Sequence, residues 1–220
     1  MLTGNVALAG CRLFEGISGE DLNKMLVCLG CTTESYKKGE VVFSEGTHIT
    51  KIGILLSGGA MTVKDDFFGN RSIIGTVGVG DVFCEAFAAT DTLELPVSVI
   101  ATEDSDILFV ECKRILCTCS NTCSFHRSLI FNFAKNLADE NIDCYDKIEV
   151  TSKRSTREKL LTYLGIVARA EGKRSFDVPF DRQELADYLE VDRSGLSAEI
   201  SKMVKDGIIR CTKNHFELLI

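Results

Sequence analysis

The stretch DRQELADYLEVDRSGLSAEISKM, residues 181–203, decides the fold of the C-terminal part of the chain. Asp181 stands three residues before Glu184, which is the spacing of a capping box at the start of a helix. Apolar residues recur with a helical period on both sides of a break at Glu190-Val191. They are Leu185, Tyr188, Leu189, Leu196, Ile200 and Met203. Asp192 is a second N-cap candidate, so the pattern predicts a helix-turn-helix, whose second helix enters the major groove of DNA.

The polar face of the second predicted helix is the candidate reading surface. It carries Arg193, Ser194, Ser197 and Lys202. An arginine near the start of such a helix can bond guanine O6 and N7 together, which discriminates between bases by about 1–3 kcal/mol. Gly195 is unfavourable inside a helix, but near its start it allows close approach to DNA. The alternative is a solvated face on an ordinary helical hairpin.

The residues around this stretch complete a winged helix. A helix is predicted over 156–170, after a basic hinge at 152–155, and a short strand is predicted at 176–180. After Gly207, two alternating segments surround Lys213-Asn214, which predicts a β-hairpin, the wing. The candidate phosphate contacts are Arg182, Lys213 and Asn214. Simple solvation of the wing tip is the alternative.

Charge is divided unevenly along the chain. The 220 residues carry a net charge of −7, which is unusual for a protein that binds nucleic acid. Residues 1–150 hold 12 Lys and Arg against 21 Asp and Glu, whereas residues 151–220 hold 13 against 11. A mildly basic C-terminal part behind an acidic part suits a sensor domain joined to a DNA-binding domain.

Residues 32–112 change to short apolar runs separated by turn residues. The runs are 41–43, 52–56, 73–77, 97–100 and 107–110. Many short strands at this spacing predict a β-barrel or jelly roll, and a helix is predicted before them at 11–29. No apolar run approaches the ~18 residues of a membrane span. The segment before Cys11 lacks the basic and apolar regions of a signal peptide, so a cytoplasmic protein without membrane contact is expected.

A long helix without Gly or Pro is predicted from Phe125 to Ile148. Its apolar residues form a heptad-like seam that includes an asparagine. The seam consists of Phe133, Leu137, Asn141, Cys144 and Ile148. Such a seam pairs two helices, and a buried asparagine can fix their register, so a homodimer is expected. The alternative is an ordinary amphipathic helix packed on its own sheet.

The chain contains ten cysteines, which in the cytoplasm are expected to be thiols or ligands rather than disulfides. The segment CTCSNTCSFH, residues 117–126, places Cys119, Cys123 and His126 on one face of a helix. Three such ligands can bind zinc or an iron–sulfur cluster. The alternative is packing of small thiols where the sheet meets the long helix. The protein is not expected to require a cofactor.

Four segments resemble one known family. The segment RQELADYLEVDRSGLSAEISKMVKDGIIR (182–210) resembles the helix-turn-helix of the Crp/Fnr superfamily of bacterial transcription regulators. The segments KKGEVVFSEG (37–46), ILLSGG (54–59) and GDVFCEAF (80–87) resemble the β-roll of cyclic nucleotide-binding domains. The resemblance implies an α+β fold in three parts. These are a cupin-like β-roll domain over 1–120, a dimerisation helix over 121–149 and a winged helix-turn-helix over 150–220.

The resemblance also implies an effector pocket in the β-roll, at Cys84, Glu85, Val97 and Ser98. In members that bind cyclic AMP, a glutamate at the position of Glu85 meets the ribose, and an Arg-Ser pair holds the phosphate. Here that pair aligns with Leu95-Pro96, which offers no charge, and Cys84 replaces a glycine that lies against the ligand. We therefore expect cyclic nucleotide binding to be lost. Glu85 is then either a structural carboxylate or a contact of another small-molecule effector.

The expected function is a homodimeric, sequence-specific transcription regulator that binds a palindromic DNA operator and, by family resemblance, RNA polymerase. An effector, or a metal or redox signal, at the β-roll would shift the pairing of the long helix and so the spacing of the two reading helices. Ala198 stands where many members have a second arginine, which implies a different operator. The alternative is a small-molecule or metal sensor whose helix-turn-helix contacts protein instead of DNA. An enzyme is disfavoured, because no third orienting group accompanies the Cys and His pairs.

Overall fold

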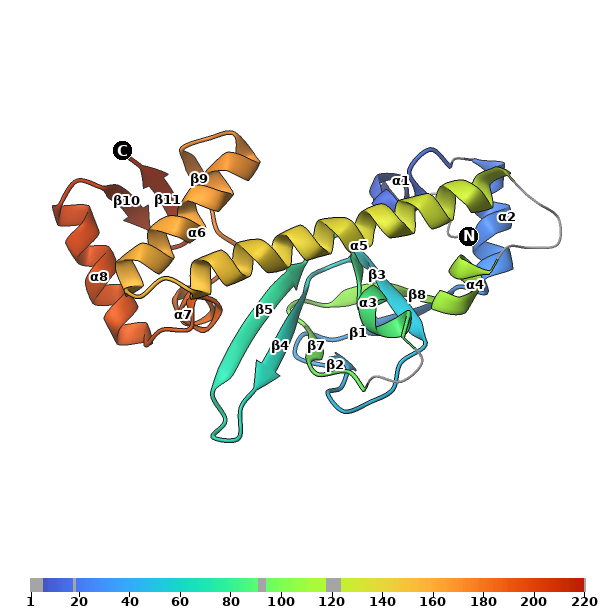
Figure 1. The fold of residues 1–220 in the computed structure, drawn as a ribbon, viewed down its shortest axis with the longest axis horizontal. Coiled ribbons are helices and arrows are strands. Elements are labelled where there is room, and N and C mark those ends of the chain that lie inside the picture. The colour runs from blue at the N-terminus through green and yellow to red at the C-terminus, as the bar shows by residue number, and fades with distance from the viewer. Residues whose placement is uncertain (1–5, 18, 91–93, 118–123, 220) are drawn as a thin grey trace. The chain divides into compact units, whose positions relative to one another are not determined.

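The computed structural model describes residues 6–17, 19–90, 94–117 and 124–219. The chain divides into two units, one of Met1–Lys64 and Gly75–Asn141, the other of Asp65–Ile74 and Ile142–Ile220. The predicted order of a β-roll, a long helix and a winged helix-turn-helix is confirmed (Figure 1). The division between the units falls inside the long helix rather than at its ends, so the predicted domain borders at 120 and 150 stay predictions.

The β-roll consists of two antiparallel sheets, each with four described strands. One sheet has the order β1-β8-β3-β6 and the other the order β2-β7-β4-β5. Their bounds are β1 (Thr32–Tyr36), β2 (Val41–Phe43), β3 (Lys51–Ser57), β4 (Ala60–Asp65), β5 (Arg71–Val77), β6 (Val82–Phe83), β7 (Ser98–Ala101) and β8 (Ser105–Glu111). The short apolar runs of the sequence therefore lie in strands, which are separated by polar turns.

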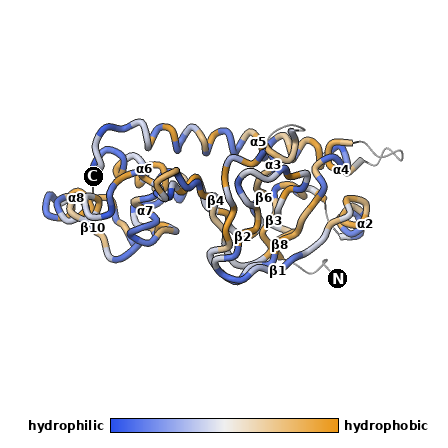
Figure 2. Tube along the Cα trace, turned by 90° about the horizontal axis from the view of Figure 1, so that it is seen from below, coloured by the Kyte–Doolittle hydropathy of each residue, from blue (hydrophilic) through white to orange (hydrophobic). Residues whose placement is uncertain are grey.

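The interior of the β-roll is filled by side chains. The apolar runs of β3 and β8 are continuous rather than alternating, which is typical of strands that are covered on both faces. The rings of Phe83 and Phe109 meet Phe43 edge to face, with centroids 6.0 and 5.6 Å away. Phe83 also lies over Gly53, where a Cβ would overlap its ring. Figure 2 shows the hydrophobic residues concentrated on these strands, whereas the long helix alternates along its length.

Helices surround the β-roll on its own unit. They are α1 (Val6–Gly10), η2 (Arg12–Phe14), α2 (Glu20–Leu29), α3 (Glu85–Ala88), α4 (Cys112–Leu116) and the first part of α5 (Ser124–Thr151). The helix predicted within residues 11–29 is confirmed as α2, which buries Leu22, Met25, Leu26 and Leu29, whereas the residues before it form the 3-10 turn η2. Gly16 and Gly19 lie between them with φ of 75° and 60°, a conformation that interrupts a right-handed helix.

The second unit contains three helices and a small sheet after the end of α5. Its elements are α6 (Thr156–Glu171), β9 (Ser175–Asp177), α7 (Arg182–Leu189), α8 (Arg193–Lys205), β10 (Ile209–Thr212) and β11 (His215–Leu218). The sheet has the order β10-β11-β9. The strand predicted over 176–180 ends earlier, at Asp177, because Pro179 has no N–H for a ladder. Leu164, Leu185 and Met203 are buried, one on each of three helices that contact one another.

None of the helices in the described ranges is long and apolar enough to cross a membrane.

Candidate functional sites

The turn between α7 and α8 is held by the local hydrogen bonds that the sequence predicts. The carboxylate of Asp181 accepts from the backbone N–H of Gln183 and Glu184 at 2.7 and 2.9 Å, and Glu184 accepts from the N–H of Asp181 at 2.7 Å. This is the predicted capping box. Glu190 then adopts the left-handed conformation, with φ of 53°, and turns the chain toward α8.

Asp192 caps α8, as predicted. Its carboxylate accepts from the N–H of Gly195 at 2.8 Å and from the hydroxyl of Ser194. These hydrogen bonds, first that from the Ser194 hydroxyl and then that from Gly195, lower the pKa of Asp192. The first turn of the recognition helix is therefore fixed before any ligand arrives.

The predicted reading face of α8 is exposed. Leu196, Ile200 and Met203 are buried on the opposite face, whereas the exposed residues are Arg193, Ser194, Gly195, Ser197 and Lys202. The Ser197 hydroxyl donates to the carbonyl of Arg193 at 3.0 Å, so it is engaged within the helix. Within the described ranges the guanidinium of Arg193 has no hydrogen-bond or ion-pair partner, so all its N–H groups remain for an outside acceptor.

Gly195 is not required by the packing of the protein itself. A Cβ at this position would meet Asp192 at 3.6 Å, an ordinary van der Waals contact, and the residue does not have positive φ. The glycine leaves the start of α8 bare on its exposed side. The close approach of DNA predicted at this residue stays a prediction.

Arg182 has a different place from the one predicted for it. Its Nη2 donates to the carbonyl of Lys213 at 3.0 Å and contacts the sulfur of Cys211 at 3.4 Å, and its guanidinium lies 5.7 Å from the centre of the Phe216 ring. The cation therefore joins α7 to the wing, and its predicted phosphate contact stays a prediction.

The wing is the hairpin of β10 and β11. Lys213 lies exposed at its tip with φ of 56°, while the Asn214 amide donates to the carbonyl of Val178 at 3.2 Å. Of the two predicted tip residues, Lys213 thus has an exposed side chain, whereas Asn214 holds the loop to Val178. The sequence did not reveal that His215 bonds both Asp177 and Ser175, each at 2.9 Å, because this needs the register of β11 on β9.

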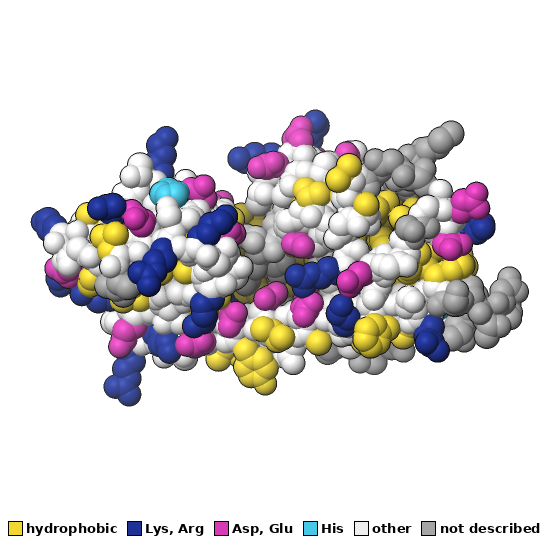
Figure 3. All heavy atoms as spheres, turned by 90° about the horizontal axis from the view of Figure 1, so that it is seen from above, with side chains coloured by type: hydrophobic (Ala, Val, Ile, Leu, Met, Phe, Trp, Pro, Cys, Tyr) yellow, Lys and Arg dark blue, Asp and Glu magenta, His cyan; other side chains and the backbone are white. Residues whose placement is uncertain are grey.

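The exposed apolar face of α5 differs from the predicted seam. Phe133 is only 3% exposed, and Leu137 is partly buried, because both pack into the core of their own unit. Of the predicted seam, Asn141, Cys144 and Ile148 lie exposed. The face left open has alternating spacings of three and four residues and consists of Phe131, Ala134, Ala138, Asn141, Tyr145 and Ile148. Figure 3 shows apolar side chains among charged ones along its lower edge, where α5 runs.

The residues of the predicted effector pocket are buried or hydrogen-bonded within the β-roll. Cys84 and Val97 are buried, and the Ser98 hydroxyl accepts from the N–H of Glu45 at 3.0 Å. At the position expected for a phosphate, Leu95 is 1% exposed, and its N–H donates to the carbonyl of Thr47 at 2.8 Å. Leu95 itself therefore offers a phosphate neither a positive charge nor a free N–H.

Glu85 begins the short helix α3 and is fully buried. The side-chain amide of Asn136 on α5 donates to it. Burial raises the pKa of Glu85, although its side-chain interactions with Glu140 and Asn136 lower it. A buried carboxyl thus connects α3 to α5, which agrees with the structural interpretation of this residue.

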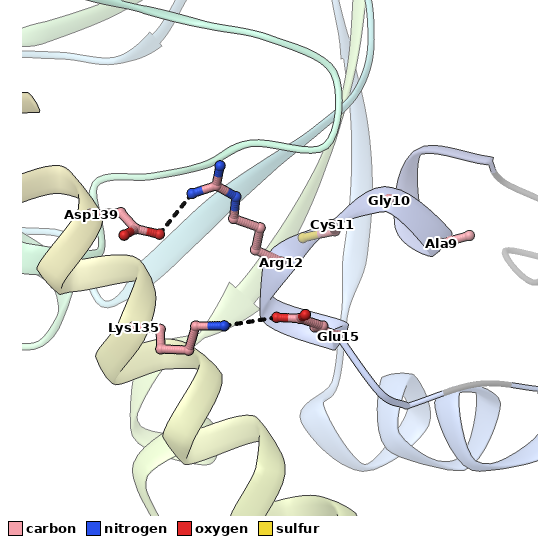
Figure 4. A pocket seen from close by; sticks show the side chains of 7 residues that line it. All are labelled: Ala9, Gly10, Cys11, Arg12, Glu15, Lys135 and Asp139. Atoms are coloured by element: carbon pink, nitrogen blue, oxygen red, sulfur yellow. Dashed lines mark hydrogen bonds and ion pairs between the residues drawn. The ribbon is translucent and has the colours of Figure 1, made fainter. Parts of the chain in front are cut away.

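A separate hollow of about 330 Å³ lies between the N-terminal segment and α5. It is lined by Ala9, Gly10, Cys11, Arg12, Glu15, Lys135 and Asp139. Figure 4 shows two ion pairs across it, Arg12 to Asp139 at 2.7 Å and Lys135 to Glu15 at 3.0 Å. Its charged groups therefore neutralise one another and fasten the N-terminal segment to α5.

The predicted metal site falls partly outside the described residues, which contain neither Cys119 nor Cys123. His126 is buried, and its Nε2 donates to the carbonyl of Ile115 at 3.1 Å. The described ranges contain no group of three or more His, Cys, Asp or Glu residues placed to hold a metal ion. Burial raises the pKa of Cys11 to about 11 and that of Cys31 to about 12, so these thiols carry little reactive thiolate.

Comparisons with known proteins match both parts of the chain. Residues 33–120 match the cyclic nucleotide-binding domain, and residues 158–220 match the Crp-like helix-turn-helix domain. The transcriptional activator protein FnrL of Cereibacter sphaeroides is 23% identical over 210 residues, covering 83% of this chain and 79% of FnrL.

Solved structures share the fold at lower identity. A CooA mutant from Carboxydothermus hydrogenoformans superposes with a TM-score of 0.73 at 18% identity, over 96% of this chain and 92% of CooA. The c-di-GMP responsive global regulator CLP of Xanthomonas campestris gives a TM-score of 0.72 at 13% identity, over 90% of this chain and 98% of CLP. With its cyclic nucleotide-binding domain, its long helix and its Crp-like helix-turn-helix, the chain belongs to the Crp/Fnr superfamily of transcription regulators.

Proposed function

We propose that the protein is a homodimeric regulator that reads a palindromic operator with α8 and is controlled by an effector other than a cyclic nucleotide. The exposed face of α8 is the observation that carries this proposal. Arg193 stands at the start of the helix, on a capped and rigid first turn, with no partner inside the described ranges. The planar fork of an arginine is suited to the O6 and N7 acceptors of guanine.

The exposed face of α5 supports pairing with a second copy. Its spacings of three and four residues are those of the a and d positions of a coiled coil. Ala134 and Ala138 allow two helices to approach closely, and Asn141 can bond its counterpart and fix the register. Two copies joined in parallel would present two α8 helices to the two halves of a palindrome.

The closed β-roll supports an effector other than a cyclic nucleotide. Cyclic nucleotides carry a phosphate, and a phosphate needs charged or N–H donors. Leu95 is buried at that place with its N–H already used. The chemistry of the effector, including a metal or redox signal through Cys119, Cys123 and His126, is left open by this proposal. Contact with RNA polymerase on the operator is part of it by family membership.

Fluorescence anisotropy with an operator selected from a random double-stranded DNA pool tests the proposal. We expect wild type to enrich a palindrome and Arg193→Ala to lose about 1–3 kcal/mol at one symmetric base position. The matched control is Arg127→Ala, which removes the same charge from an exposed position on α5. Weak, non-selective binding that ignores Arg193 would instead favour a sensor whose helix-turn-helix contacts protein.

A further inference from the structure

The C-terminal end of α7 is held by two lysines from other helices. Lys147 of α5 donates to the carbonyl of Tyr188. Lys159 of α6 donates to the carbonyls of Leu189 and Glu190 at 3.1 and 3.2 Å. The last carbonyls of a helix have no partners within it and carry the negative end of its dipole, so ammonium groups are favourable there.

Lys147 is partly buried and has contacts in addition to the one with the Tyr188 carbonyl. Its Nζ also donates to the carbonyl of Ile73 on β5 at 2.9 Å and lies 3.9 Å from the centre of the Tyr188 ring. Burial lowers the pKa of Lys147 to about 8; of the nearby charges, Glu190 raises it and Lys159 lowers it. A lysine desolvated to this degree is unfavourable unless its hydrogen bonds compensate.

The carbonyls that accept from Lys147 and Lys159 lie directly before the turn that leads into α8. Tyr188 is followed directly by the last residue of α7, by Glu190 in the left-handed conformation and by Asp192, the cap of α8. Only three residues separate the Lys147 contact from that cap. A change in the end of α7 therefore changes the direction in which α8 starts.

We propose that Lys147 is a positioning residue for DNA recognition, which holds the end of α7, and with it the recognition helix α8, against α5. It acts through the Tyr188 carbonyl, and its ammonium faces protein acceptors rather than phosphate. The inference rests on the proposed function, because it assigns the residue that orients the reading helix.

Two measurements on Lys147→Met test this proposal. The first is NMR hydrogen exchange at the Val191 amide, which bonds the carbonyl of Ala186 in the turn. We expect exchange there to be faster by about tenfold or more, the scale of a lost hydrogen bond to a charged donor. The second is operator affinity across a salt series. We expect a loss of about tenfold at an unchanged salt slope, because no phosphate contact is removed.

The matched control is Lys135→Met, which removes an ion-paired lysine from the same helix in the other unit. Exchange and affinity equal to those of the control would overturn the proposal. A salt slope reduced by about one with unchanged exchange would also overturn it, because Lys147 would then contact phosphate. If wild type binds no operator, the proposed function fails, and the exchange measurement alone decides the positioning role.

If Lys147→Met does not fold, Lys147→Arg is measured in its place, because arginine keeps the positive charge and the N–H donors. A folded arginine variant with protected Val191 supports the role of the hydrogen bonds. Failure of both variants to fold would place Lys147 in general stability and overturn the positioning role.

Discussion

At the scale of the residue, two arginines near helix starts have opposite surroundings. Arg193 is exposed and without a partner in the described ranges, whereas Arg182 bonds the wing. The sequence predicts the caps Asp181 and Asp192 because a cap bonds residues two or three positions away. It does not separate the arginines, because the partner of Arg182 lies 31 residues further along the chain. The contacts of Lys147 with Ile73 and Tyr188 are also distant in sequence, so the sequence did not predict them.

Glu85 gives a prediction about stability and pH. Its pKa is raised in the folded protein because it is buried. Below the ordinary pKa of a glutamate both states are protonated. As pH rises above that value the unfolded state ionises first, so the stability contributed by protonated Glu85 is lost as pH approaches and passes its folded pKa. We expect wild type to lose stability over this window, and Glu85→Gln to lose less.

Denaturant unfolding of both proteins from about pH 4 to pH 8 measures this difference. The amide of the variant can still accept the hydrogen bond from Asn136. Parallel stability curves for wild type and Glu85→Gln would contradict the prediction, because the buried carboxyl would then contribute nothing to the pH dependence.

At the scale of the element, local patterns predicted more than long-range packing did. The period of apolar residues located α7, α8 and the strands of the β-roll. The long helix was also predicted, but α5 carries two apolar stripes. One contains Phe133 and faces its own core, while the other contains Phe131 and is exposed. Both have heptad-like spacing, so only the packing of the β-roll distinguishes the stripe that remains for a partner.

The two stripes predict opposite results for two phenylalanines on α5. Phe133 is 3% exposed and Phe131 is 66% exposed. We expect Phe133→Ala to reduce the free energy of unfolding by about 3–5 kcal/mol, because a cavity forms in the core. Phe131→Ala should leave the stability of the fold within about 1 kcal/mol and weaken self-association, because it shortens the exposed seam.

Sedimentation equilibrium and chemical unfolding of the two variants separate these effects. Unfolding of both is compared at a concentration where wild type is monomeric, since pairing itself adds stability. The prediction is contradicted if Phe133→Ala weakens self-association while Phe131→Ala leaves both stability and self-association unchanged. The seam that contains Phe133 would then be the pairing face.

At the scale of the whole molecule, the sequence separates an acidic sensor part from a mildly basic reading part, and the two matched domains follow that division. The family was predictable because caps, glycine turns and apolar periods depend on local residues. The closed β-roll was predictable only in part. Leu95-Pro96 indicated the loss of a phosphate site, but the filling of the interior depends on the pairing of Phe83 with Gly53 and on the contact of Phe83 with Phe43 of the other sheet.

The change in the free energy of unfolding when a ligand is added tests the helix-turn-helix and the β-roll together. Operator DNA at about 100 times its Kd should raise the free energy of unfolding by about 2.7 kcal/mol, because it binds only the folded state. Cyclic AMP at about 1 mM should leave the free energy of unfolding unchanged. If cyclic AMP instead bound with a Kd of about 10 μM, it would raise this free energy by the same ~2.7 kcal/mol. Leu95 is buried and its N–H is used, so this residue offers no donor to the phosphate. A cyclic AMP shift comparable with that of the operator would mean that the β-roll opens and binds the nucleotide through other donors.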